Sequence, residues 1–494
     1  MEAQKVKRVV IAGGGTAGWI AAAALVKQLG PLIDITLVES DEIGTVGVGE
    51  STIPTTRTFH SLLGIYEQAF IRATNSTFKL GIEFENWNHI GDRYFHSFGS
   101  VGKGVWMADF QHFWLEARRQ GFGGDYGDYS LELKAAEANK FATSEDTTLG
   151  YAYHLDATAY ARFLRGLAEP AGVRRIEGKI NQVVQNAETG FVEALVLESG
   201  TRIEGDLFID CTGFRALLIE QTLKTGFNDW SEWLATDAAL AVQTASTGPA
   251  VPYTRAIAHE AGWRWRIPLQ NRVGNGFVYC SDYMTEDEAR AKFGAAIEGE
   301  PLFTPRLLRF KAGSRARTWN KNVIAMGLSS GFIEPLESTS IHLIKIAVTR
   351  LIQSFPFGGI DASLVDRFNA VSSKELAHIR DFIILHYKLT ERDDSPFWRR
   401  CRDMTIPDSL AERIALFRDN AMAYQAGDEL FRIDSWIMVM LGQGIEPRSY
   451  HALARMMEPG QLKQALTDLK AGITARLAQL PQHQEFVESY AGAG

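Results

Sequence analysis

A glycine-rich turn near the start of the chain constrains the fold more than any other feature of the sequence. The turn, 13–18, reads Gly-Gly-Gly-Thr-Ala-Gly and satisfies the pattern G-x-G-x-x-G. A short β-branched run, 7–12, precedes it, and an alanine-rich stretch, 16–29, follows it. This order predicts a strand, a tight turn and a helix whose first backbone N–H groups face a pyrophosphate.

A carboxylate stands where such a unit needs one. A second strand is predicted at 33–38, and Glu39 ends it, about 20 residues after the turn. A carboxylate there can accept hydrogen bonds from both ribose hydroxyls of an adenosine group. These features predict one bound dinucleotide, and a purely structural glycine turn is the alternative. The residues expected to bind it are Gly13, Gly15, Thr16, Ala17, Gly18 and Glu39.

The rest of the chain predicts a mixed α/β fold that ends in helices. Short alternating strands between 173 and 210 are separated by the sequences 188–190 and 198–200, which are typical of hairpin turns. Another buried strand is expected at 322–326, so the last strand of the nucleotide-binding domain is expected to come late in the chain. From about Phe355 onward the apolar spacing is helical.

We therefore predict two domains. Residues 1–354 form a Rossmann-like FAD-binding domain of the flavin monooxygenase type, with substrate-side segments inserted at about 85–150 and 215–320. Residues 355–494 form a helical domain packed on it. FAD is favoured over NAD because antiparallel insertions and late closure are typical of flavoproteins. Only one fingerprint occurs, so we expect reduced FAD to come from a separate NAD(P)H-dependent flavin reductase.

Composition excludes several other functions. The 51 basic and 59 acidic residues give a net charge of -8, without the basic stripe that nucleic-acid binding requires. The 3 cysteines lack metal-ligand or disulfide spacing, so we expect a cytoplasmic protein without a metal. An uncharged run, 9–26, follows three basic residues, but its glycines argue against a membrane anchor or signal peptide.

Three further segments are more specific than the nucleotide fingerprint. They are 47–54 (GVGESTIP), 263–268 (WRWRIP) and 331–340 (GFIEPLESTS). With them the chain resembles the flavin-dependent tryptophan halogenase family over most of its first 350 residues. The resemblance implies that reduced FAD, oxygen and halide yield hypohalous acid, which passes through a tunnel to an aromatic substrate. It also implies further cofactor contacts at Val48, Gly49, Glu50, Val183, Leu328 and Ile341.

The resemblance assigns two catalytic residues. Lys79 matches the lysine that meets hypohalous acid at the substrate end of the tunnel. A neutral amine could form a chloramine, whereas an ammonium could donate a hydrogen bond to the acid. An unperturbed lysine, with a pKa near ~10.4, is cationic at neutral pH unless burial removes the charge, and we favour the ammonium. Glu337 is expected to stabilise and deprotonate the cationic ring intermediate. A surface lysine and a carboxylate at a helix N-terminus are the structural alternatives.

The remaining site residues bind halide or shape the tunnel. Backbone N–H groups of Ser338, Thr339 and Ser340 open a helix and can hold chloride or bromide, although the family has glycine where this chain has Ser340. Trp263 and Trp265 are two positions apart on a predicted strand, so their side chains point to the same face. They could form a tunnel wall that keeps the substrate away from the flavin, or they could be an ordinary pair that faces the core. The tunnel and substrate residues are His96, Phe98, Trp263, Trp265, Ile267 and Pro268.

The segment 431–450 does not align with the family's clamp for the amino and carboxyl groups of tryptophan. Indole or a substituted indole is therefore the expected substrate. An aromatic monooxygenase and a non-catalytic flavin-binding protein are the alternative functions. The Trp263/Trp265 pair and Lys79 argue against the monooxygenase.

Overall fold

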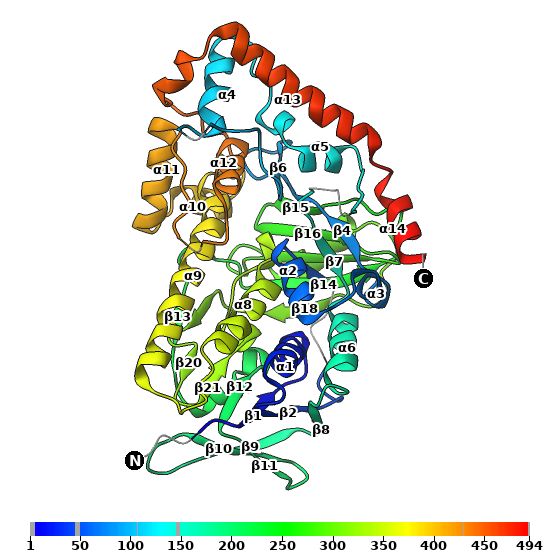
Figure 1. Cartoon of the computed structure of the whole chain (residues 1–494), viewed down its shortest axis with the longest axis vertical. Coiled ribbons are helices and arrows are strands. Elements are labelled where there is room, and N and C mark those ends of the chain that lie inside the picture. Colours follow the sequence, from blue (N-terminus) through cyan, green and yellow to red (C-terminus); the bar gives the residue numbers. More distant parts are fainter. Residues whose placement is uncertain (1–4, 45–49, 106, 145–148, 428, 493–494) are drawn as a thin grey trace. The chain divides into compact units, whose positions relative to one another are not determined.

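The computed structural model describes residues 5–44, 50–105, 107–144, 149–427 and 429–492 (Figure 1). The chain forms two compact units. Unit 1 contains residues 1–76, 155–237 and 309–377, and unit 2 contains 77–154, 238–308 and 378–494. These units interleave the chain, whereas the sequence predicts two consecutive domains, 1–354 and 355–494. The mixed α/β fold class is confirmed.

Unit 1 is built on a six-stranded sheet in the order β20-β21-β12-β1-β2-β8. Every neighbouring pair is parallel except β20 and β21. The all-apolar interior of β1 is typical of a parallel strand that is buried on both faces. The strands are β1 (Arg8–Ala12), β2 (Asp34–Glu39), β8 (Arg174–Glu177), β12 (Leu207–Asp210), β20 (Trp319–Asn320) and β21 (Val323–Ala325).

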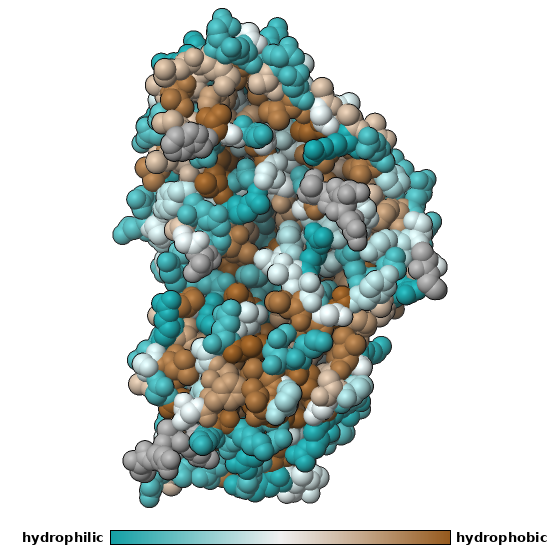
Figure 2. All heavy atoms as spheres, in the orientation of Figure 1, coloured by the Kyte–Doolittle hydropathy of each residue, from teal (hydrophilic) through white to brown (hydrophobic). Residues whose placement is uncertain are grey.

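Helices lie against this sheet and a second sheet packs on its core. Helix α1 (Thr16–Leu29) contacts both α6 (Ala157–Ala168) and α8 (Ser340–Gln353). The antiparallel strands β9 (Ile180–Gln185), β10 (Val192–Leu197) and β11 (Arg202–Glu204) share an apolar core with β1 and β12. Arg202 and Glu204 of β11 are exposed. The lower end of the view, where Figure 1 labels β9 to β11, is largely hydrophilic in Figure 2. The predicted hairpins and the predicted helix 16–29 are confirmed.

Smaller elements complete unit 1. Helices α2 (Thr55–Leu63) and α3 (Glu67–Ala73) follow the short strand β3 (Glu50–Ser51). A three-stranded sheet contains β13 (Phe227–Asp229), β19 (Gly313–Arg315) and β22 (Gly331–Phe332).

Unit 2 is built on a seven-stranded sheet in the order β18-β14-β17-β16-β15-β5-β6. Strands β14 to β17 form antiparallel pairs, and β5 joins β15 in parallel. These strands are β5 (Gly81–Glu85), β6 (Arg93–Ser97), β14 (Ala238–Thr244), β15 (Thr254–His259), β16 (Gly262–Pro268), β17 (Val273–Tyr279) and β18 (Arg306–Arg309). A separate antiparallel pair, β4 (Thr77–Lys79) and β7 (Ala152–Leu155), carries Lys79.

Most of the remaining elements of unit 2 are helices. Those after Phe355 agree with the helical spacing of apolar residues in the sequence. Helix α9 (Ala362–Lys388) contributes residues to both units. The other helices are α4 (Phe110–Arg119), α5 (Leu131–Glu137), α7 (Glu286–Ala296), α10 (Pro396–Asp403), α11 (Asp408–Asn420), α12 (Ile433–Gly442), α13 (Pro459–Gln479) and α14 (His483–Gly492).

One buried carboxylate organises the carboxyl end of the unit 1 sheet. Asp210 ends β12 and is fully buried. It accepts hydrogen bonds from the backbone N–H groups of Thr212, Leu218 and Ile219 at 2.9, 2.8 and 2.9 Å. The hydroxyls of Thr212 and Ser329 donate to it at 2.7 and 3.1 Å. These bonds join the loops after β12 and β21, because buried polar groups must be satisfied internally.

Candidate active site

The glycine turn between β1 and α1 uses its three motif glycines in two ways. Gly13 has φ +107°, and a Cβ there would lie 2.3 Å from the carbonyl oxygen of Cys211, which follows β12. A Cβ on Gly18 would lie 1.9 Å from the Gly13 carbonyl oxygen. A Cβ on Gly15 would meet nothing within 4 Å. Gly13 and Gly18 therefore allow tight packing, and Gly15 leaves an open approach to the turn.

The N-terminus of α1 is open for an anion. Gly15 caps the helix without a side-chain hydrogen bond, and the first turn contains no acidic residue. Thr16 directs its hydroxyl toward the Ala157 carbonyl, 3.3 Å away. The first N–H groups of a helix have no intrahelical acceptor, and the helix dipole favours negative charge there. This end of α1 therefore fits the pyrophosphate of a dinucleotide.

Glu39 ends β2 beside this turn, as predicted, but it has a partner that sequence reasoning missed. Its carboxylate accepts from Arg175 Nε at 2.5 Å and from Trp19 Nε1 at 3.3 Å. A Cβ on Gly14 would lie 1.6 Å from Glu39 Oε2, so the carboxylate lies directly over the turn. A carboxylate has about four acceptor positions, so capacity remains for ribose hydroxyls. Arg175 fixes the orientation of the group.

The other predicted cofactor contacts lie in several places in unit 1. Val48 and Gly49 fall outside the described residues, and Glu50 begins β3, where burial raises the pKa of its carboxyl to about 7. Val183, on β9, packs against the apolar core. Leu328 follows Gly327, whose added Cβ would lie 2.8 Å from Ala17 Cβ at the start of α1. Ile341 is buried in the first turn of α8.

The predicted acid and the predicted halide residues form one buried turn in unit 1. Glu337 ends a single turn of 3-10 helix, Pro335–Glu337, and is fully buried. Thr339 is the N-cap residue of α8, but its side chain makes no capping hydrogen bond. No hydrogen-bond partner for its buried hydroxyl is found among the described residues. The open helix N-terminus and this hydroxyl provide donors that fit a halide ion.

The residue that needs unusual backbone angles is Ser338, not Ser340. Ser338 has φ +60°, in the left-handed region, whereas Ser340 is the first residue of α8. The replacement of the family's glycine by Ser340 therefore falls at a position whose helical backbone angles suit a residue with a Cβ. The left-handed backbone occurs two residues earlier, at Ser338.

Lys79 is fully buried on β4 in unit 2, which excludes the surface-lysine alternative. Its Nζ lies 5.0 Å from the centroid of the Phe98 ring. His96, also buried, has ring contacts with Phe98 and Phe382 at 6.4 and 5.6 Å between centroids. Three predicted residues, Lys79, His96 and Phe98, are thus neighbours. A cation over an aromatic face is stabilised by about 0.5–2 kcal/mol.

The two predicted wall tryptophans lie on the same face of β16. The ring centroids of Trp263 and Trp265 are 5.9 Å apart, and Trp263 lies 6.3 Å from Trp87. Gly276 on β17 faces Trp265, and an added Cβ would lie 2.0 Å from its ring. Ile267 and Pro268 end the strand and are buried. This packing of the two rings is compatible with both interpretations of the pair, a tunnel wall and a core-facing pair.

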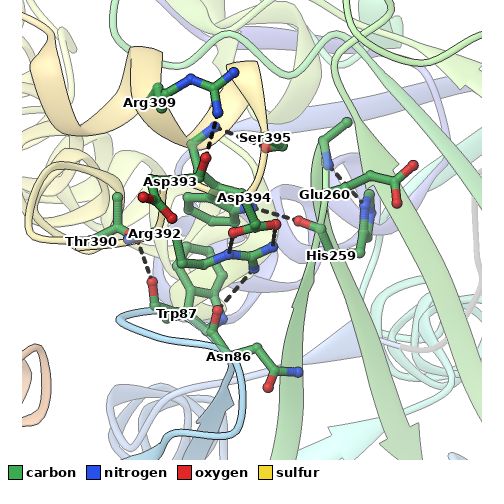
Figure 3. Close-up of polar contacts among 12 residues, drawn as sticks. Asn86, Trp87, His259, Glu260, Thr390, Arg392, Asp393, Asp394, Ser395 and Arg399 are labelled. Carbon is green, nitrogen blue, oxygen red and sulfur yellow. Dashed lines mark hydrogen bonds and ion pairs between the residues drawn. The ribbon is translucent and has the colours of Figure 1, made fainter.

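A polar junction around Arg392 lies beside Trp87, whose carbonyl accepts from the Thr390 hydroxyl (Figure 3). Arg392 donates two hydrogen bonds to Asp394, at 2.8 and 2.7 Å, and one to the Asn86 carbonyl at 2.9 Å. Its guanidinium lies 4.6 Å from the Trp398 ring. Trp398 Nε1 donates to the His259 carbonyl at 2.6 Å. The junction holds the aromatic residues on which Trp263 packs, because Trp398 lies 5.5 Å from Trp87.

Lys79 and Glu337 belong to different units, and each unit carries one set of the predicted catalytic residues. Within the described ranges, no group of three His, Cys, Asp or Glu side chains could hold a metal ion. None of the helices in the described part of the chain has the length and apolar character needed to span a membrane.

The glycine turn, the open helix end and Glu39 define a dinucleotide-binding oxidoreductase fold, and comparisons identify the family. The chain matches the model of the tryptophan halogenase family over residues 8–459. It is 34% identical to tryptophan 7-halogenase RebH of Lentzea aerocolonigenes, with 99% of both chains covered. The chain belongs to the tryptophan halogenase family, and it is a flavin-dependent halogenase.

Solved structures agree with this assignment. Xcc4156, a flavin-dependent halogenase from Xanthomonas campestris, is 55% identical, with a TM-score of 0.97 and 99% of each chain covered. BrvH, a flavin-dependent halogenase from Brevundimonas sp. BAL3, is 41% identical, with a TM-score of 0.94 over 98% of this chain and 99% of that one. The resemblance in the sequence motifs is therefore confirmed.

Replacing Glu39 should weaken FAD binding. We expect Glu39→Ala to raise the dissociation constant for FAD about 10- to 100-fold, because it removes charge-assisted hydrogen bonds to the ribose. Titration of FAD against protein fluorescence measures this change. Asp41→Ala is the matched control, since Asp41 also pairs with Arg175 but is largely exposed. Equal losses in both variants would contradict the role of Glu39.

Burial of His259 should make stability depend on pH. Burial lowers its pKa to about 3, and the ring is held by the Ala261 N–H and the Val278 carbonyl. The unfolded chain takes up this proton first, near pH ~6.5, so wild-type stability falls on acidification by about 1.4 kcal/mol per pH unit between ~6.5 and the folded-state pKa. The His259→Gln variant has no histidine at this position to protonate, so its free energy of unfolding should not fall on acidification for this reason. Urea unfolding at pH 7, 6, 5 and 4 should therefore show that the difference in free energy of unfolding between wild type and variant becomes smaller as the pH falls. A difference that does not change with pH would contradict the lowered pKa of His259.

Proposed function

We propose that this enzyme chlorinates or brominates an electron-rich aromatic ring, and that its substrate is indole or a substituted indole. The observation that carries the proposal is the buried Lys79 side chain, whose Nζ lies 5.0 Å from the centroid of the Phe98 ring, in the same unit as the paired tryptophans of β16. Hydroxylation by a monooxygenase would need no such lysine.

Gly13, Gly15, Gly18 and Glu39 would hold FAD at the start of α1. Reduced FAD bound there supplies, with oxygen and halide, the hypohalous acid that halogenates the ring. The chain has a single nucleotide fingerprint, so we assign reduction of FAD to a separate NAD(P)H-dependent reductase. We place the enzyme in the cytoplasm, because Cys211, Cys280 and Cys401 are all free thiols.

Lys79 acts in this proposal as an ammonium that donates a hydrogen bond from Nζ to hypohalous acid. The Phe98 face stabilises the positive charge. Burial also lowers the pKa of the neighbouring His154 well below its usual value, so no second cation opposes the ammonium. The donor polarises the oxygen–halogen bond and holds the acid next to the ring. These two features favour the ammonium over the chloramine alternative.

Glu337 accepts the ring proton on a carboxylate oxygen after halogen has added. Its complete burial excludes water and strengthens its stabilisation of a cationic ring. The N–H groups at Ser338, Thr339 and Ser340 bind the halide beside the flavin. Trp263 and Trp265 keep the organic substrate away from the flavin, so oxygen is not transferred to the ring.

The choice of indole over tryptophan rests on the segment that contains α12. Two of its charged residues, Arg432 and Asp434, pair with each other at 2.9 Å, and Arg432 also donates to Ser100 Oγ at 2.6 Å. Gln443 donates to the His386 carbonyl at 2.7 Å. A clamp for an amino acid needs charges that are available to an ammonium and a carboxylate. Arg432 and Asp434 are already paired with each other, and the Gln443 amide already donates to His386.

Removing the Lys79 amine should abolish halogenation but not FAD binding. We expect Lys79→Met to lower turnover about 100-fold or more, the usual contribution of a positioned proton donor. Lys140→Met is the control, because Lys140 is a partly buried lysine of unit 2 that donates to the Leu477 carbonyl. Product is measured by mass spectrometry with a flavin reductase and bromide. Wild-type turnover in Lys79→Met would refute the proposal.

The substrate preference can be measured by direct competition. With indole and tryptophan at equal concentrations, we expect halogenated indole to exceed halogenated tryptophan by about 10-fold or more, because free tryptophan must place its charged groups without partners. The isotope pattern of each product identifies the halogen. A preference for tryptophan would overturn the substrate assignment while leaving the halogenase assignment intact.

A further inference from the structure

Two buried histidines contact the strand that carries Lys79. His154 lies on β7 and faces Thr77 in the register of the β4–β7 pair, and His483 begins α14. Both rings are fully buried. Neither residue belongs to a motif that the sequence singles out, and both lie in unit 2 with Lys79.

The hydrogen bonds of Thr77 fix the tautomer of His154. The Thr77 hydroxyl donates to the Pro268 carbonyl at 2.7 Å, and a hydroxyl has only one hydrogen. It must therefore accept from His154 Nδ1, 3.1 Å away. Nε2 of a neutral ring is then an acceptor for the Thr254 hydroxyl, at 2.9 Å. The chain of bonds runs in one direction, from Thr254 through His154 and Thr77 to Pro268.

His483 holds the next residue of the same strand. Its Nε2 accepts from the backbone N–H of Phe78 at 3.2 Å, and its Nδ1 lies 2.7 Å from the Ala250 carbonyl. A carbonyl can only accept, so Nδ1 carries the proton and Nε2 is free to accept. His483 is therefore also neutral and in the Nδ1–H form. Burial lowers its pKa to about 4.

Helix α14 is attached firmly enough to serve as a support. The Phe78 ring stacks on Phe141 at 4.3 Å and contacts Phe486 and Tyr490 of α14, each at 5.6 Å between centroids. The backbone N–H of His483 donates to the Asn139 carbonyl at 2.8 Å. Aromatic contacts of this kind add about 0.5–1.5 kcal/mol each beyond burial.

We propose that His154 and His483 are positioning residues that hold β4 and thereby fix Lys79 relative to the tryptophan pair of β16. His154 connects Thr77 to Thr254 on β15 and leaves the Thr77 hydroxyl to donate to Pro268, the last residue of β16. His483 connects Phe78 to α14. Neither ring touches the reacting atoms. The inference rests on the function proposed for Lys79, and it adds α14 to the machinery of the site.

The two rings must stay neutral for this arrangement. A proton on Nε2 of His483 would face the Phe78 N–H, so two donors would meet and the bond would be lost. A proton on Nε2 of His154 would require the Thr254 hydroxyl to turn and accept, and it would charge a buried ring near Lys79. Burial, and after it the charge of Lys79, already lower the pKa of His154.

The tautomers can be observed without any activity assay. In protein labelled with ¹⁵N-histidine at pH 7.5, His154 and His483 should each give a ring spectrum with a protonated Nδ1 and an unprotonated Nε2. Signals are assigned by their loss in His154→Gln and His483→Gln. An Nε2–H tautomer or an imidazolium at either position would overturn the inference.

Variants then separate positioning from general stability. The readout is the ratio of halogenated indole to hypohalous acid released into solution, trapped as the sulfoxide of an added thioether. We expect His483→Leu to lower this ratio about 10-fold or more, since small misplacements near reacting groups cost up to about 100-fold. His483→Gln, whose amide oxygen can accept from Phe78 N–H, should restore most of it.

His112→Leu is the matched control. His112 is a buried histidine of α4 whose Nδ1 accepts from the His451 N–H, away from β4. It should lower the melting temperature without changing the product ratio. Equal ratios in wild type and His483→Leu, or equal losses in His483→Leu and His112→Leu, would overturn the inference.

The double variant Lys79→Met/His483→Leu distinguishes failure of the inference from failure of the proposed function. If the histidine acts through Lys79, His483→Leu should have no further effect on the ratio in the Lys79→Met background. A further loss there would overturn the positioning role. Wild-type activity in Lys79→Met alone would refute the function of Lys79, while the tautomer spectra would still test how β4 is held.

Discussion

The close approach of the glycine turn to the backbone after β12 is the constraint on which the nucleotide-binding unit depends. A Cβ on Gly13 would lie 2.3 Å from the Cys211 carbonyl oxygen, so only glycine allows β1 and β12 to continue side by side into their loops. The same packing places Asp210, at the end of β12, where it can bind the loop after β21 through Ser329. Glu39, the helix N-terminus of α1 and the Gly327 loop consequently meet at one edge of the sheet.

Local patterns predicted the elements well, because period and turn chemistry are local. The helix 16–29, the strand 207–210 and the hairpins at 188–190 and 198–200 all follow from spacing within a few residues. The interleaving of the two units is different, since it depends on which segments distant in the sequence pack together. Apolar spacing alone cannot assign residues 77–154 and 378–494 to one unit.

The candidate site was predicted in part for the same reason. The contact between Lys79 and Phe98 joins residues of two neighbouring motifs, so the family resemblance was enough to bring them together. Arg175 and His483 lie far along the chain from Glu39 and Phe78, and a lone arginine or histidine carries no motif. The left-handed backbone at Ser338 was not predicted, because apolar spacing does not resolve where the turn ends and α8 begins.

The interleaved construction of the units has a consequence for engineering. Each unit draws on three separate stretches of the chain, so no single cut yields a contiguous fragment with its own complete core. Chimaeras that exchange unit 2 between relatives must therefore transplant all three of its stretches together. A junction placed inside α9 would divide one continuous helix between two parents and disturb both cores at once.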